Sequence, residues 1–193
     1  YYDNGTNGYN WWAGAGVPFT WAIKFEPADL AGLEGASLTK LAIFNTYAPD
    51  VNTLNIYVGN HEGGSSTLVH TQILNGLTVS SWNEVELTVP VPIDVTQQLW
   101  ITMFSPAPTG GVASSDNSGI VNTKADYFNY GTGWGHLSNL GYSTVWNLRV
   151  FATNAVQNRN LEIVHNDFIP KYMKNVPAGL SPFGEPPDTT KTR

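Results

Sequence analysis

Hydrophobic and polar positions alternate along most of residues 19–152, with the two-residue period that is typical of β-strands. The clearest case is residues 19–25, in which every second side chain is a large apolar one: Phe19, Trp21, Ile23 and Phe25. The same pattern predicts further strands over residues 37–45, 53–58, 67–74, 82–91, 98–104 and 144–152. Only residues 27–33 predict helix, as a short turn between two strands.

The order of these elements indicates the fold class. Glycine, proline, asparagine and serine separate the short strands, and no long helix alternates with them. We therefore predict an all-β protein, an antiparallel β-sandwich of jelly-roll type, over residues 1–155. Residues 156–193 predict a Pro-rich C-terminal extension or linker, with one edge strand at 161–164.

Composition narrows the setting and the partners. Only 12% of the residues are charged and 12% are aromatic, a balance that favours an extracytoplasmic β-protein. Cysteine is absent, which excludes disulfides and fits either a bacterial or a cytosolic setting. We expect it to be extracellular, on the cell surface, or at the periplasm-facing outer membrane. The net charge of −6, with no cluster of Lys or Arg, argues against nucleic acid as a partner. The chain contains no transmembrane run, and attachment through a lipid anchor upstream is compatible with it.

Seven segments with strand patterns follow one another along the chain: residues 37–44, 54–58, 68–72, 82–87, 91–94, 99–101 and 146–151. In this order they resemble a β-sandwich module of secreted and surface proteins of Bacteroidetes-type bacteria. In such bacteria the module accompanies peptidases, adhesins and lipoproteins, so the resemblance implies an accessory role in binding or adhesion. It implies no catalytic residues.

No group of residues predicts a catalytic centre. The histidines form no H-x-H or H-x-x-x-H pair, and we expect His61 and His70 to be ordinary surface residues. No G-x-S-x-G motif provides a nucleophile. Glu84 and Glu86 share one face of a predicted strand whose other face carries valine and leucine, so they are expected to face solvent rather than a glycosidase cleft. We therefore predict no catalytic residues and no enzyme activity.

Two oxygen-rich loops are candidates for a structural calcium ion. Residues 3–8 include Asp3 and residues 114–119 include Asp116, and both loops combine oxygen-bearing side chains with glycine, as a hard cation site needs. Neither has the full D-x-D-x-D-G spacing, and ordinary turn chemistry is the alternative. No other cofactor is predicted.

Aromatic residues gather in two segments that do not alternate regularly, residues 9–12 and 124–136. Aromatic rings beside amide and carboxylate groups suit carbohydrate, because a ring stacks on the apolar face of a sugar while polar groups meet its hydroxyls. The same rings suit a protein interface. The predicted ligand-binding residues are Trp12, Asp126, Tyr127, Tyr130 and Trp134. The alternative is that these rings cap the sandwich core.

Three functions follow from these observations. The favoured one is a noncatalytic binding module for carbohydrate or a surface protein, engaged by aromatic end loops. The second is a structural spacer of a larger surface protein or secreted peptidase. The third, a glycan-active enzyme, lacks a converging acid and base. Solvent exposure of the aromatic rings decides between the first two functions. An exposed row of Tyr127, Tyr130 and Trp134 favours binding, whereas full burial of these rings removes the proposed binding site.

Overall fold

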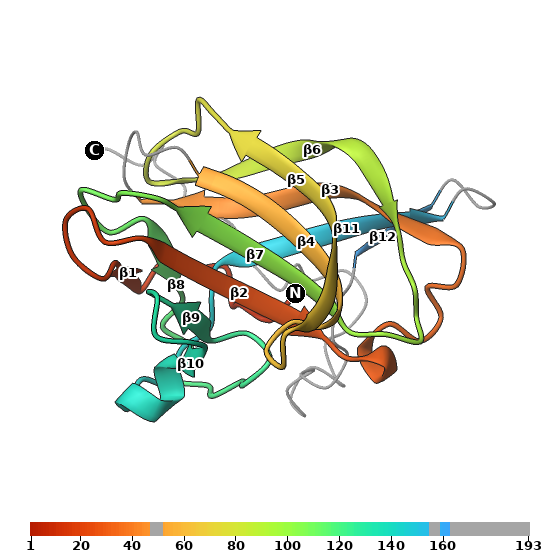
Figure 1. Ribbon diagram of the computed structural model, residues 1–193. Coiled ribbons are helices and arrows are strands. Elements are labelled where there is room, and N and C mark those ends of the chain that lie inside the picture. The colour runs from red at the N-terminus through yellow and green to blue at the C-terminus, as the bar shows by residue number, and fades with distance from the viewer. Residues whose placement is uncertain (47–51, 155–158, 163–193) are drawn as a thin grey trace, which may run out of the picture.

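A computed structural model describes residues 1–46, 52–154 and 159–162, the last range by its backbone only. In this part of the chain, antiparallel strands form two larger sheets that pack face to face (Figure 1). The predicted all-β antiparallel sandwich is confirmed. The Pro-rich residues 163–193 lie outside the described residues. None of the described helices is long and apolar enough to cross a membrane.

The larger sheet has six strands in the order β10-β9-β2-β7-β4-β5. Its central strand is β2, which pairs with β7 on one side and with β9 on the other. The strands of this sheet are β2 (Phe19–Phe25), β4 (Asn52–Asn60), β5 (Ser65–Leu74), β7 (Leu99–Ser105), β9 (Tyr127–Asn129) and β10 (Gly135–His136). Every neighbouring pair is antiparallel.

The second sheet has four strands in the order β12-β11-β3-β6. They are β3 (Ala36–Asn45), β6 (Ser81–Pro92), β11 (Leu148–Asn154) and β12 (Arg159–Glu162). Strand β12 lies at the edge predicted for residues 161–164, although it begins earlier, and residues 163–164 lie outside the described part. A two-stranded sheet of β1 (Tyr9–Trp11) and β8 (Ala113–Ser115) lies at one end of the sandwich, beside β9 and β10 (Figure 1).

The helical elements are short turns of 3₁₀ type among the described residues. The predicted helix at 27–33 is η1 (Pro27–Asp29), which begins after Glu26 with a capping box between Glu26 and Asp29. The second, η2 (Leu137–Leu140), follows β10 directly and ends at Gly141, whose φ of 88° favours glycine.

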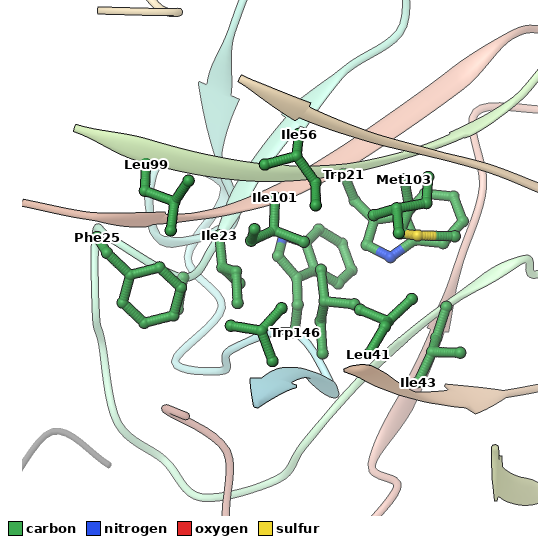
Figure 2. Close-up of a cluster of buried hydrophobic side chains, with 14 of the residues drawn as sticks. Trp21, Ile23, Phe25, Leu41, Ile43, Ile56, Leu99, Ile101, Met103 and Trp146 are labelled. Carbon is green, nitrogen blue, oxygen red and sulfur yellow. The ribbon is translucent and has the colours of Figure 1, made fainter. Parts of the chain in front are cut away.

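The core lies between the two large sheets, where their apolar faces meet (Figure 2). The four residues predicted to share one face of β2 are all buried. Trp146 precedes β11 and enters the middle of this core, where it is fully buried and its indole Nε1–H donates to the Tyr127 carbonyl at 2.7 Å. Alternation therefore predicts the core correctly over most strands.

Strand β6 departs from the predicted alternation at one position. Val85, Leu87 and Val91 pack on the core as expected, but Val89 is 62% exposed. The physical reason is an irregular register between β3 and β6, where Lys40 pairs with Glu86 and Leu38 with Val91. The extra residues turn Val89 out to solvent. β6 is an edge strand, as its prolines predict.

Candidate functional site

The predicted ligand-binding residues fall into two separate groups, because part of the segment is strand rather than loop. Tyr127 and Phe128 are neighbours on β9, so their side chains point to opposite faces of the sheet. Tyr127 packs on the outer face of the six-stranded sheet, whereas Phe128 packs on the core side, with the ring of Tyr130 stacked on it at 5.8 Å. The proposed row of three exposed rings is therefore not formed: Tyr127 is 3% exposed and Tyr130 is 46% exposed.

Trp12 and Tyr130 line a groove of about 420 Å³ at the end of the sandwich. Its deeper part is formed by buried apolar side chains, and its rim by exposed ones. We call this the aromatic groove. It is lined by Trp11, Trp12, Ala13, Phe19, Phe128, Tyr130, Leu137, Leu140 and Tyr142.

The rim of the aromatic groove is unusually apolar for a protein surface. Trp12 is 44% exposed, Tyr142 42% and Leu140 59%, while Phe19, Phe128 and Leu137 beneath them are buried. Exposed apolar residues are ordinary when scattered singly, but a contiguous set around a hollow marks an interaction site. The aromatic groove is therefore the strongest candidate binding site among the described residues.

Contacts between rings fix one wall of the groove. Trp11 meets Tyr142 edge-on at 4.6 Å and meets the buried Trp146 edge-on at 6.2 Å. The indole Nε1–H of Trp11 donates to Ser115 Oγ at 2.8 Å. Because Trp146 is rooted in the core, this wall is held in place before any ligand arrives, and little side-chain entropy remains to be lost on binding.

Strand β1 reaches this position through close backbone packing against β8. Tyr9 pairs with Ser115 and Trp11 with Ala113. Gly8 lies so close to the Asp116 carbonyl that a Cβ atom there would be 2.5 Å from the oxygen. Only glycine permits this approach, which sets the position of the residues that lead into Trp11 and Trp12.

Asp126 holds the opposite wall although it does not reach the groove. Its carboxylate is fully buried and accepts hydrogen bonds from His136 Nδ1 at 2.6 Å, Ser138 Oγ at 2.6 Å and Ser138 N at 3.1 Å. These bonds anchor the start of η2, which carries Leu137 and Leu140 into the groove. Asp126 is thus a positioning residue rather than the ligand contact that its place among aromatic residues suggested.

The chain segments that line the groove contain no charged residue. No Asp, Glu, Lys or Arg occurs in residues 4–23, 95–115 or 127–148, and these segments supply every lining residue as well as β8. All charged residues of the protein lie in the remaining segments of the chain, and together they give a net charge of −6. Among the described residues, the aromatic groove therefore offers ring faces, an indole N–H and phenol hydroxyls, but no ionic group.

Tyr127 and Trp134 belong to a second aromatic group, which we call the sheet-face cluster. It covers the outer face of the six-stranded sheet around Trp100, which is fully buried although it faces away from the core. Lys24 lies over the Trp100 and Tyr127 rings, at 5.3 and 5.2 Å from their centroids, and pairs with Glu26 at 3.0 Å. The other members are Tyr57, His61, Trp134 and His136.

Burial changes the proton affinity of this cluster. It raises the pKa of Tyr57, and it raises the pKa of Tyr127 against the opposing effect of Lys24. Burial lowers the pKa of His61, which stacks on Tyr57 at 3.8 Å. For Lys24, burial acts to lower the pKa, but hydrogen bonds to Tyr127 and Glu26 outweigh it and the pKa is raised. The cluster is a small outer core that holds β9 and the β4–β5 turn on the sheet.

The two loops that were predicted to hold calcium lie side by side, and hydrogen bonds between them join the two loops directly. Asp3 is ion-paired with Arg149, whose Nε lies 2.9 Å from Asp3 Oδ2 and whose Nη2 contacts Oδ1. Asp116 is fully buried and accepts from Asn4 N, Ser118 Oγ, Thr144 Oγ1 and Val145 N. A calcium ion at either carboxylate would have to displace these donors. Within the described residues, no cluster of three or more His, Cys, Asp or Glu side chains could hold a metal ion.

A second hollow, of about 750 Å³, lies along the edge strands β5 and β6. Gln72 bridges the two strands there: its Nε2 donates to the Glu86 carbonyl at 3.1 Å, and its Oε1 accepts from Thr88 N at 2.9 Å. His70 lines this hollow and is 8% exposed, so the expectation of a surface histidine is wrong. It faces inward because it pairs with Ile56 on β4, a core residue.

Comparison with protein-family models, with curated proteins and with solved structures found no match.

Proposed function

We propose that this protein is a noncatalytic extracytoplasmic module that binds carbohydrate in the aromatic groove. The observation that carries the proposal is the set of exposed rings around a hollow whose walls are fixed by the core. Its extracytoplasmic setting is inferred from the low charge, the aromatic content and the resemblance of the strand pattern to bacterial surface modules.

Carbohydrate suits the groove for two reasons. Aromatic faces stack on the C–H faces of sugar rings, and Trp12, Tyr130 and Tyr142 present such faces at the rim. The indole N–H and phenol hydroxyls of the same side chains can exchange hydrogen bonds with sugar hydroxyls. Aromatic amphipathic side chains thus supply both kinds of contact without flexible charged groups.

The noncatalytic assignment is supported by the lining itself. Among the described residues, no carboxylate, histidine, serine or cysteine lines the groove, and its only ionisable side chains are the phenols of Tyr130 and Tyr142. The pair of carboxyl groups that most glycosidases use is therefore missing from this lining. Glu84 and Glu86 lie on an exposed strand and pair with Lys40, at 2.9 and 3.6 Å. They do not face each other across a cleft, as a glycosidase pair does.

A glycan array read with the wild-type protein and three variants tests this function. We expect the wild type to bind, and Trp12→Ala to weaken the best hit at least tenfold, as loss of an aromatic hot spot does. Ile73→Ala, which changes an exposed apolar residue on β5, is the control and should bind like the wild type.

Trp134→Ala separates the two aromatic groups. Binding that is lost in Trp134→Ala and kept in Trp12→Ala would move the site to the sheet-face cluster and overturn the proposal. A wild-type protein that binds no glycan would leave the spacer function as the better account.

A further inference from the structure

We infer that the glycan taken by the aromatic groove is a neutral one, without uronic acid, sulfate or sialic acid. This inference rests on the proposed function and specifies the ligand class of the same site. It derives from the charge pattern of the surface rather than from the rings, so it can fail while carbohydrate binding stands.

The first step is the lining, which contains no cation in the part of the chain that the structure describes. Acidic sugars are usually bound through Arg or Lys, because a carboxylate or sulfate that loses water needs a charged or multiple hydrogen-bonding partner. Here the nine lining residues are aromatic or aliphatic, and the segments that carry them, 4–23 and 127–148, contain no Lys or Arg. An acidic group placed in the groove would meet no cation among these residues to offset its loss of water.

The second step is the fixed use of two cations that directly follow uncharged segments in the sequence. Arg149, which follows the last uncharged segment, is engaged by Asp3 and lies between the rings of Trp82 and Tyr1, 4.0 and 4.2 Å from their centroids. Lys24, which follows the first, is held in the sheet-face cluster with only 12% of its side chain exposed. Neither cation lines the groove.

The third step is the field of the whole protein. The protein's net charge of −6 repels anionic polymers at low ionic strength, whereas it exerts no net electrostatic force on a neutral glycan. The affinity for a neutral glycan should consequently be almost independent of salt, because no ion pair is screened.

The experiment compares matched neutral and acidic glycans on one array: asialo and sialylated N-glycans, and methyl-esterified and free-acid oligogalacturonides. We expect signal on uncharged members only, with at least tenfold weaker binding to the acidic partner of any bound glycan. The Kd of the strongest neutral hit, measured by calorimetry, should change less than twofold between 0.05 and 0.5 M NaCl.

A pair of lysine variants tests whether the groove itself sets the preference. Leu140→Lys adds a cation at an exposed rim position, and should raise binding to acidic members relative to neutral ones by at least threefold. Val89→Lys adds the same charge on β6 in the other sheet, and should leave the ratio unchanged.

The outcomes separate the two claims. Equal or stronger binding of acidic glycans by the wild type, or equal ratios in the two lysine variants, would overturn neutral selectivity while leaving carbohydrate binding intact. Absence of binding to every glycan would instead overturn the proposed function, and the selectivity with it.

Discussion

Replacing Asp126 by alanine should strongly destabilise the protein and disturb the groove together. The carboxylate is fully buried and accepts three hydrogen bonds, two from Ser138 and one from His136. A hydrogen bond to a charged group contributes about 1.5–3 kcal/mol, and each donor left without a partner in a buried place costs about 1–3 kcal/mol. Water can reach His136, whose side chain is 18% exposed, and this recovers part of the loss.

The net cost should therefore be about 3–5 kcal/mol in the free energy of unfolding. For a chain of this size, a loss of 1 kcal/mol lowers the Tm by about 2–4 °C, so Asp126→Ala should melt about 6–20 °C below the wild type. Glycan affinity should fall as well, because η2 loses the anchor that carries Leu137 and Leu140 into the groove.

Thermal unfolding followed by circular dichroism measures this difference, with Asp94→Ala as the matched control. Asp94 also accepts three hydrogen bonds, from the N and Oγ1 of Thr96 and from Gln97 Nε2, but it is exposed. Its replacement should lower the Tm by less than about 2 °C. Similar melting temperatures for the two variants would refute the reasoning that burial makes Asp126 an anchor.

Three further predictions concern titratable residues outside the groove. Arg149→Ala should lower the free energy of unfolding by about 3–5 kcal/mol, because it leaves the Asp3 carboxylate buried and unpaired. Arg149→Lys should not restore this stability in a denaturant titration, since lysine can neither form the two-pronged contact with Asp3 nor stack on the rings of Tyr1 and Trp82. Burial lowers the pKa of His61 below the unfolded value of 6.5, so the stability that its neutral form contributes is fully present above pH 6.5. The difference in Tm between the wild type and His61→Gln should therefore shrink as the pH falls below 6.5. A difference that grows as the pH falls would contradict the shift. Hydrogen bonds already satisfy the Asp116 carboxylate, so the Tm measured with calcium should exceed the Tm measured with EDTA by less than about 1 °C. A Tm that rises with calcium concentration, and no longer does so in Asp116→Asn, would instead establish a structural calcium site.

Alternation predicted the sandwich because it reports directly which side chains face the core. Residues 19–25 match β2, and the outward glutamates of residues 82–91 lie on the outer face of β6. It was wrong at Val89, where an irregular register that depends on β3 overrides the local pattern. A bulge is a property of two paired strands, so one strand's sequence does not predict it.

The candidate site was only partly predictable for a related reason. The segment 124–136 shows no sustained alternation, so β9 was not predicted, although it separates Tyr127 from Phe128 and Tyr130. Trp12 and Tyr130 were identified from their aromatic character, but Phe19, Leu140 and Tyr142 were not, because only the fold brings these distant segments to the same end. One signal in the sequence could have pointed there, namely the lack of charge in residues 4–23 and 127–148.

The most direct test of carbohydrate binding in the aromatic groove is NMR of the tryptophan indole N–H groups during titration with the best neutral oligosaccharide. The chain has seven tryptophans, and each gives one such signal, assigned by single Trp→Phe variants. We predict that the Trp12 signal moves most and Trp11 next, while the signals of the buried Trp21 and Trp100 and that of Trp134 stay in place. Movement of Trp134 with Trp12 unchanged would contradict the account.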